Sequence, residues 1–142
     1  MRHAWQRWTD LSRRERLTFV QALFLLPLAG LVLRFGRYQS VLSKLQKMTP
    51  LRERRSTVDP LLEAQRTAVL VNSAVRRGFY DATCLRRSLV LWWLLRRRGI
   101  ESRLRIGARI EGDMFSAHAW VEYQDIVLND SPDVRKRFAT ML

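Results

Sequence analysis

The hydrophobic pattern of this chain changes its period about two thirds of the way along its 142 residues. Up to residue 98, apolar residues recur every three or four positions, which places them on one face of α-helices. From residue 103, apolar and polar residues alternate, as they do on the two faces of a β-strand. The alternating apolar positions are Leu104, Ile106, Ala108 and Ile110. Helices followed by antiparallel strands predict an α+β fold, and the length fits one domain.

The first helix is predicted from a polar start signal and an apolar run. Ser12 and Glu15 have the spacing of a capping box, so we expect a helix from about Arg13. Pro27 lacks an amide hydrogen and clashes with the preceding turn. We therefore expect it to kink or end this helix, with a second helix over residues 28–35.

Three further helices are expected, over residues 41–48, 60–77 and 84–98. A charged connector with a proline at each end separates the first two of these. Asp81 and Thr83 are the candidate N-caps of the last helix, and Gly99 follows its end. Because this helix is almost entirely apolar between Leu89 and Leu95, we predict that it is the central buried helix.

The composition restricts the compartment and the cofactors. The chain has one cysteine, which excludes an internal disulfide framework and favours a reducing compartment such as the cytoplasm. One cysteine and two histidines are too few for a Cys/His zinc cage, so we expect neither a metal nor a cofactor. The apolar run at 17–33 is at the lower limit for crossing a bilayer. Since Gln21, Pro27 and Gly30 interrupt it, a buried helical hairpin is the preferred interpretation, with peripheral membrane contact as the alternative.

The net charge of +13 would attract nucleic acid, anionic lipid or an acidic peptide. The arginines occur in short clusters between apolar positions, and most such clusters are solvated helix faces. The sequence shows no helix-turn-helix or RNA-binding pattern. We therefore expect no nucleic acid partner, although a non-catalytic basic binding module remains an alternative.

Three residues have the types and the order of a cysteine catalyst. Cys84 begins a helix, where free amides and the positive end of the helix dipole favour a thiolate and can stabilise an oxyanion. His118, in a second strand-like run at residues 115–123, would act as the general base and acid. Asp130, at the end of a third run at residues 126–130, would hold the imidazole in the required tautomer. Taken singly, the three residues are more often a core cysteine, a packed histidine and a turn aspartate.

The loop between the last two strand-like runs tests the role of Asp130. Directly paired residues of an antiparallel hairpin point to the same face. A two-residue turn at Gln124 and Asp125 pairs Ala119 with Asp130 and turns His118 away. A three-residue loop puts His118 opposite Asp130, so we predict an odd-length loop or a bulge.

Three segments resemble the transglutaminase-like leader peptidases of lasso-peptide biosynthesis. They are the helix from Cys84 to Ile100, the strand Leu104–Gly107 and the segment Phe115–Glu122, whose Ala-His-Ala-Trp-Val-Glu text is the most specific part. Trp8, Glu15-Arg16 and the apolar helices also resemble the front of these proteins. The resemblance implies a papain/transglutaminase-like cysteine-protease fold, with a docking region at 1–50 and a peptidase core at 60–142.

The resemblance also implies an activity and partners. The expected enzyme is a cysteine endopeptidase that removes the leader from a lasso-peptide precursor, with Cys84, His118 and Asp130 matching the family's catalytic triad. The chain is similar to the split form, which depends on a separate leader-recognition protein and acts before a lasso cyclase. The alternative on the same triad is a transglutaminase-type acyltransferase, in which an amine instead of water resolves the acyl-enzyme.

Overall fold

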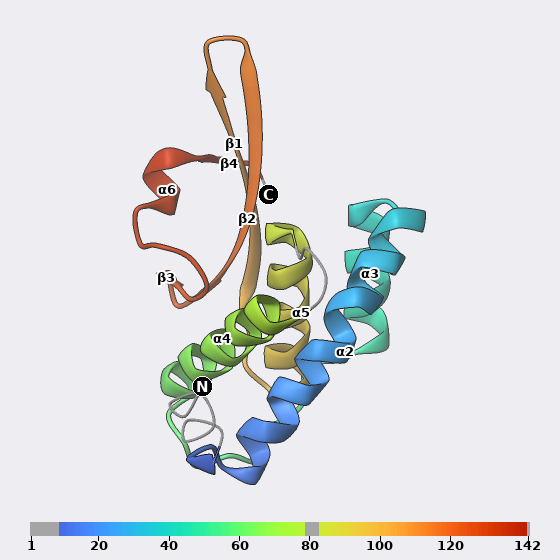
Figure 1. The fold of residues 1–142 in the computed structure, drawn as a ribbon, viewed down its shortest axis with the longest axis vertical. Coiled ribbons are helices and arrows are strands. Elements are labelled where there is room, and N and C mark those ends of the chain that lie inside the picture. The colour runs from blue at the N-terminus through green and yellow to red at the C-terminus, as the bar shows by residue number, and fades with distance from the viewer. Residues whose placement is uncertain (1–8, 79–82, 142) are drawn as a thin grey trace.

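The computed structural model describes residues 9–78 and 83–141 (Figure 1). Long helices come first and a four-stranded antiparallel sheet follows, so the α+β prediction is confirmed. The helices are α2 (Arg13–Phe35), α3 (Tyr38–Met48), α4 (Pro60–Arg77), α5 (Cys84–Arg97) and α6 (Val134–Arg137). The strands are β1 (Arg103–Glu111), β2 (Met114–Tyr123), β3 (Ile126–Val127) and β4 (Ala139–Thr140).

Polar side chains start α2 and α4. The predicted capping box is present, because the Ser12 amide donates to Glu15 Oε2 over 2.8 Å and the Glu15 amide donates to Ser12 Oγ over 3.2 Å. In α4 the Asp59 carboxylate accepts from the amide of Leu62 over 3.0 Å, and Pro60 occupies the first turn. Three residues of the sequence interpretation lie outside the described residues: His3, Trp8 and Asp81.

The prediction of two helices separated at Pro27 is wrong. Helix α2 continues through this proline to Phe35, and the predicted second helix at 28–35 is its last part. An internal proline costs a helix about 3 kcal/mol. Burial offsets that cost, since side chains on both sides of the proline pack into the core. Before it, Phe19, Ala22 and Leu26 are at most 6% exposed, and after it, Ala29 and Leu33 are partly buried against the same cluster.

Gly99 ends α5, as predicted. Its φ of 75° is a left-handed conformation that favours glycine, and a Cβ there would collide with the carbonyl oxygen of Arg52. The connector that contains Arg52 therefore packs closely under the end of α5. No residue from 50 to 59 lies in a helix or strand, which confirms the predicted connector.

The sheet has the strand order β3-β2-β1-β4. Strands β1 and β2 form a long hairpin in which Arg103 pairs with Glu122 and Glu111 pairs with Met114. The short elements β4 and α6 were not predicted, because two and four residues are too few to show a period.

Two apolar clusters cover the two faces of the sheet. The main core joins α2, α4 and α5 to one face of the hairpin through Leu104 and Val121. On the other face, Trp120 packs with Val134 and Phe138 of the C-terminal segment. Helix α2 shares this main core with α4 and α5. The division of the chain into a docking region at 1–50 and a peptidase core at 60–142 stays a prediction.

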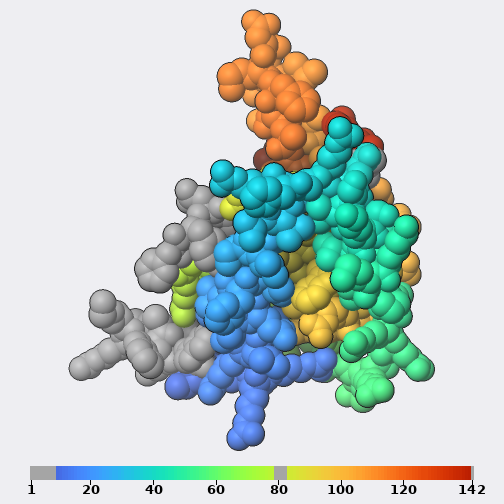
Figure 2. All heavy atoms as spheres, turned by 90° about the vertical axis from the view of Figure 1, so that its right-hand side faces the viewer, coloured from blue at the N-terminus to red at the C-terminus, as the bar shows by residue number. Residues whose placement is uncertain are grey.

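The far end of the β1–β2 hairpin extends beyond the helices (Figures 1 and 2). Its apolar side chains are exposed there: Ile110 by 73%, Met114 by 75% and Phe115 by 65%. By length and composition, α2 is the one helix of the described chain that could cross a membrane, a criterion that core helices also meet.

Candidate active site

Cys84 occupies the first position of α5, where the sequence predicted it. Thr83 is the N-cap, and its hydroxyl accepts from the amide of Arg86 over 3.4 Å. The amides of Cys84 and Leu85 have no hydrogen-bond partner among the described residues. The thiol is free and partly exposed, so it is open to chemistry rather than sealed in the core.

A buried polar network joins α5 to β2. Ser88 is fully buried, and its hydroxyl donates to the carbonyl oxygen of Ala119 over 3.0 Å. The same hydroxyl accepts from Nδ2 of Asn129 over 2.9 Å. The Asn129 side-chain oxygen in turn accepts from the amide of Val121 over 2.9 Å. These three hydrogen bonds fix the start of α5 against the strand that carries His118.

The loop prediction was wrong, because the hairpin between β2 and β3 has a tight two-residue turn. Gln124 and Asp125 have φ values of 46° and 63°, and Tyr123 pairs with Ile126. These signs are those of a type I′ turn. If β3 continued in this register, Ala119 would pair with Asp130. The side chains of His118 and Asp130 would then point to opposite faces of the sheet.

The chain reaches His118 by leaving the ladder after Val127. The amide of Leu128 still donates to the carbonyl of Val121 over 2.9 Å. The amide of Val121, however, donates to the side chain of Asn129 rather than to a backbone carbonyl. Residues 128–130 bend out of the strand at this point, and the predicted third strand over 126–130 is only two residues long. The bend carries Asp130 to the histidine in spite of the even register.

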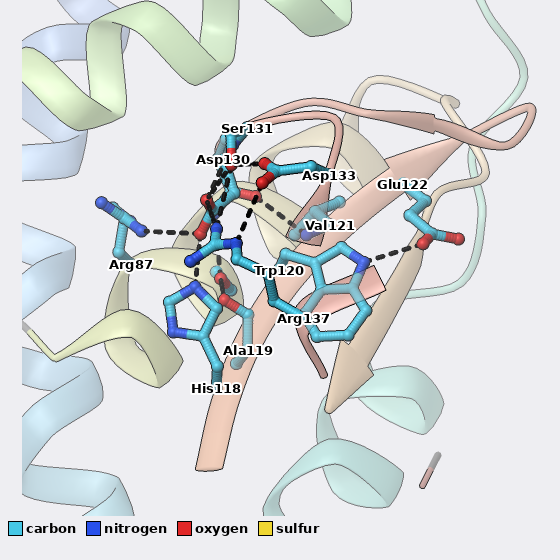
Figure 3. Close-up of polar contacts among 12 residues, drawn as sticks. Arg87, His118, Ala119, Trp120, Val121, Glu122, Asp130, Ser131, Asp133 and Arg137 are labelled. Atoms are coloured by element: carbon cyan, nitrogen blue, oxygen red, sulfur yellow. Dashed lines mark hydrogen bonds and ion pairs between the residues drawn. The ribbon is translucent and has the colours of Figure 1, made fainter. Parts of the chain in front are cut away.

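His118 and Asp130 are in direct contact (Figure 3). The hydrogen bond joins Nε2 of the imidazole to Oδ2 of the carboxylate. No described residue hydrogen-bonds to Nδ1, which leaves this nitrogen for a substrate or a thiol. The ring stacks on Phe138 at 5.1 Å and on Trp120 at 6.3 Å between centroids. A Cβ at Gly107, the β1 partner of His118, would lie 2.8 Å from both aromatic side chains, so glycine is required there.

Positive charges surround Asp130. Arg87 Nη2 lies 3.9 Å from Oδ2, Arg137 Nη2 lies 3.4 Å from Oδ1, and the Ser131 amide donates to Oδ1 over 2.7 Å (Figure 3). Burial alone raises the pKa of Asp130, but the hydrogen bond from His118, the Ser131 amide and the neighbouring charges outweigh it and hold the pKa below its ordinary range. The carboxylate is therefore ionised and suited to orient the imidazole.

Cys84 lies one helical turn before two residues of this site. Arg87, three positions later, faces Asp130, and Ser88, four positions later, contacts the residue after His118. Residues three and four apart share a helix face, about 4.5 and 6 Å apart along the axis. The face of α5 that begins with Cys84 is thus the face turned toward the His118–Asp130 pair.

Several residues of the site were missed from the sequence. Ser88 is the clearest, since a serine one turn after the cysteine inside an apolar helix is a signal for a buried polar contact. Asn129 gave no such signal, because Asn-Asp is a common turn pair. Arg87 and Arg137 were hidden among many arginines.

Glu122 supports the wall behind the histidine. This buried carboxylate accepts from Trp120 Nε1 and from Arg135 Nε, each over 2.7 Å, and pairs with Arg105 at 3.3 Å. Burial raises its pKa, but these hydrogen bonds outweigh burial and lower the pKa below the ordinary value. The C-terminal segment is thereby tied to β2.

Chemically, the arrangement offers a helix-start thiol, an oriented imidazole and two free helix amides. In the part of the chain that the structure describes, no cluster of three or more side chains could hold a metal ion.

Comparison with known proteins gives one match. The family model described as Transglutaminase-like superfamily matches residues 22–142, which takes in α5, the sheet and most of α2. No curated protein and no solved structure matched the chain.

Proposed function

Because this chain belongs to the transglutaminase-like superfamily, we propose that it is a cysteine endopeptidase that removes the leader from a lasso-peptide precursor. Members of this superfamily are generally catalytic, as proteases or acyltransferases. The observation that carries the proposal is the His118–Asp130 contact through Nε2, on a strand to which the helix that begins with Cys84 is hydrogen-bonded through Ser88.

In the proposed mechanism, the Cys84 thiolate attacks the carbonyl carbon of the scissile peptide bond. The free amides of Cys84 and Leu85 point from the helix start and would donate to the oxyanion that forms. Protonated His118 then gives its proton to the leaving amine, and the carbon–nitrogen bond breaks. His118 next takes a proton from water, whose oxygen attacks the acyl-thioenzyme and releases the leader acid. Asp130 holds the ring and stabilises its charged form.

The proposed partner is a separate leader-recognition protein, and α2 offers a surface for it. One outward stripe of this helix is apolar and exposed, from 38% at Val20 to 81% at Phe35. Its members recur every three or four positions: Leu17, Val20, Phe24, Leu28, Leu31, Val32 and Phe35. We call them the α2 stripe, and Figure 2 shows the side of the molecule on which α2 and α3 lie. Contiguous exposed apolar surface of this kind marks interaction sites.

The α2 stripe is tested with surface variants, not by deleting the N-terminal region, because α2 also supplies core side chains. Phe24→Glu with Phe35→Glu should weaken capture by the recognition protein and leave the fold unchanged. Arg34→Glu, also on α2, is the matched control for added negative charge. If the wild type binds vesicles of anionic lipid and does not capture the recognition protein, the stripe is assigned to a membrane instead.

The activity is tested by incubating the chain with the recognition protein and the precursor, followed by mass spectrometry. Two fragments whose summed mass exceeds that of the precursor by one water are expected, and Cys84→Ala should abolish them. Cleavage by the Cys84→Ala protein would show that the mechanism is wrong.

An acyltransferase is the second candidate, since the superfamily match covers it equally. It would join the acyl group to an amine, and the product would then lack the added water. The partly exposed position of the thiol at a helix start serves both reactions. The mass of the product therefore separates the two candidates.

A further inference from the structure

The outer edge of β2 is open beside the candidate site. Strand β3 pairs only with Glu122 and Tyr123, at the far end of β2. The segment 114–119 pairs with β1 on one side, and no described strand pairs with its other side. This open segment ends at His118 and Ala119.

The hydrogen bonds further along β2 show which backbone groups face this edge. Val121 uses its amide and its carbonyl outward, toward Asn129 and Leu128. Ala119 uses its carbonyl outward, toward Ser88. Because the direction of backbone groups alternates along a strand, Phe115 and Ala117 also point their N–H and C=O outward. Neither residue has a hydrogen-bond partner for these groups in the described chain.

Ideal helix and strand geometry brings Cys84 to about the level of Ala117 along this edge. Helix α5 and strand β2 run in the same direction, with the helix start toward the hairpin tip (Figure 1). Ser88 is level with Ala119 because the two are hydrogen-bonded. Four residues back along a helix is about 6 Å, and two residues back along a strand is about 6.6 Å. The thiol and the unpaired groups of Ala117 are therefore at one height.

The open edge is also apolar. Phe115 is 65% exposed and pairs with Ile110, which is 73% exposed, while Ala108 pairs with Ala117. These four residues lie on the same face of the sheet as Ala119, Val121 and Leu104, which are buried in the part of the sheet nearer α5. An exposed apolar edge strand is a template for another strand and is normally protected in monomeric proteins. Here it leads directly to the candidate catalytic residues.

We propose that the precursor peptide binds as an added β-strand along Phe115–Ala117, with its scissile bond beside Cys84. This inference rests on the proposed function and names how that site takes its substrate. Backbone hydrogen bonds to Phe115 and Ala117 hold the peptide extended, and one face of the added strand rests against the Phe115–Ile110 pair. Such recognition reads main chain first and side chains at alternate positions.

The test uses Ala117→Pro, which removes the outward amide and leaves the pairing with β1 intact, as edge strands tolerate. Its matched control is Ala117→Ser, which keeps the amide. With the recognition protein present, Ala117→Pro should lower kcat/KM for the precursor roughly 3- to 10-fold, the effect of one hydrogen bond. Ala117→Ser should leave it unchanged. Hydrolysis of p-nitrophenyl acetate, which is too small to form a strand, is measured in all three proteins, and Ala117→Pro should lower kcat/KM for the precursor more than it lowers the rate with this ester.

A second measurement leaves the protein unaltered. Precursor peptides that each carry one amide-to-ester replacement near the cleavage site are compared. The value of kcat/KM should fall only for replacements at alternate positions. The added strand would be overturned, and the proposed function would stand, if wild type and Ala117→Pro cleave the precursor at equal rates and the ester peptides show no alternation. Absence of cleavage by the wild type would overturn the proposed function, and with it this inference.

Discussion

Replacing Ser88 by alanine tests whether the buried network fixes α5 to β2. The hydroxyl is fully buried and joins the carbonyl of Ala119 to Nδ2 of Asn129. Removing it leaves a buried acceptor and a buried donor unpaired, at about 1–3 kcal/mol each. The higher helix propensity of alanine returns about 0.5 kcal/mol. The expected loss in the free energy of unfolding is therefore about 1.5–5.5 kcal/mol.

Ser102 provides the matched control. It is also a buried serine, 8% exposed, but its hydroxyl has no hydrogen-bond partner in the described chain. Ser102→Ala should therefore change the free energy of unfolding by less than about 0.5 kcal/mol or stabilise the fold, since nothing is left unpaired. Urea unfolding followed by circular dichroism measures both variants. Equal losses for the two serines, or no loss for Ser88→Ala, would refute the reasoning.

The remaining predictions concern the histidine, its wall and its support. Asp130→Asn should keep the fold and lower kcat roughly 10²- to 10⁴-fold, because the imidazole loses its charged orienting partner; unchanged turnover would remove Asp130 from the mechanism. Gly107→Ala should cost about 1–3 kcal/mol in the free energy of unfolding, measured with urea, because its Cβ meets Trp120 and Phe138 at 2.8 Å; an unchanged free energy would contradict this close packing. For Glu122, the folded pKa lies below the unfolded one, so its stabilisation is complete above the ordinary glutamate pKa of about 4.3 and is lost as pH falls through the folded pKa. The difference in unfolding free energy between wild type and Glu122→Gln should accordingly shrink on acidification, and a pH-independent difference would contradict this origin.

The sequence was sufficient where local chemistry determines structure. The Ser12 capping box and Gly99 after α5 each fulfil a backbone requirement within a few residues, and both were predicted. Pro27 misled because the packing of α2 against distant helices outweighs its local cost.

The candidate site shows the same division. The residue types and order of Cys84, His118 and Asp130 were legible, and the structure brings His118 and Asp130 into contact. How they meet was not legible, because the bend after Val127 depends on a hydrogen bond between Asn129 and Val121 and on the distant Ser88. Long-range side-chain contacts of this kind leave no periodic signal in a single sequence.

The central claim is that His118 acts on the sulfur of Cys84. Since the chain contains one cysteine, iodoacetamide labelling reports on that sulfur alone. The rate of labelling near neutral pH, measured by mass spectrometry for the wild type and for His118→Ala, tests the claim most directly. The account predicts labelling at least about ten times faster in the wild type, because the imidazole favours the thiolate. Equal rates in the two proteins would contradict it.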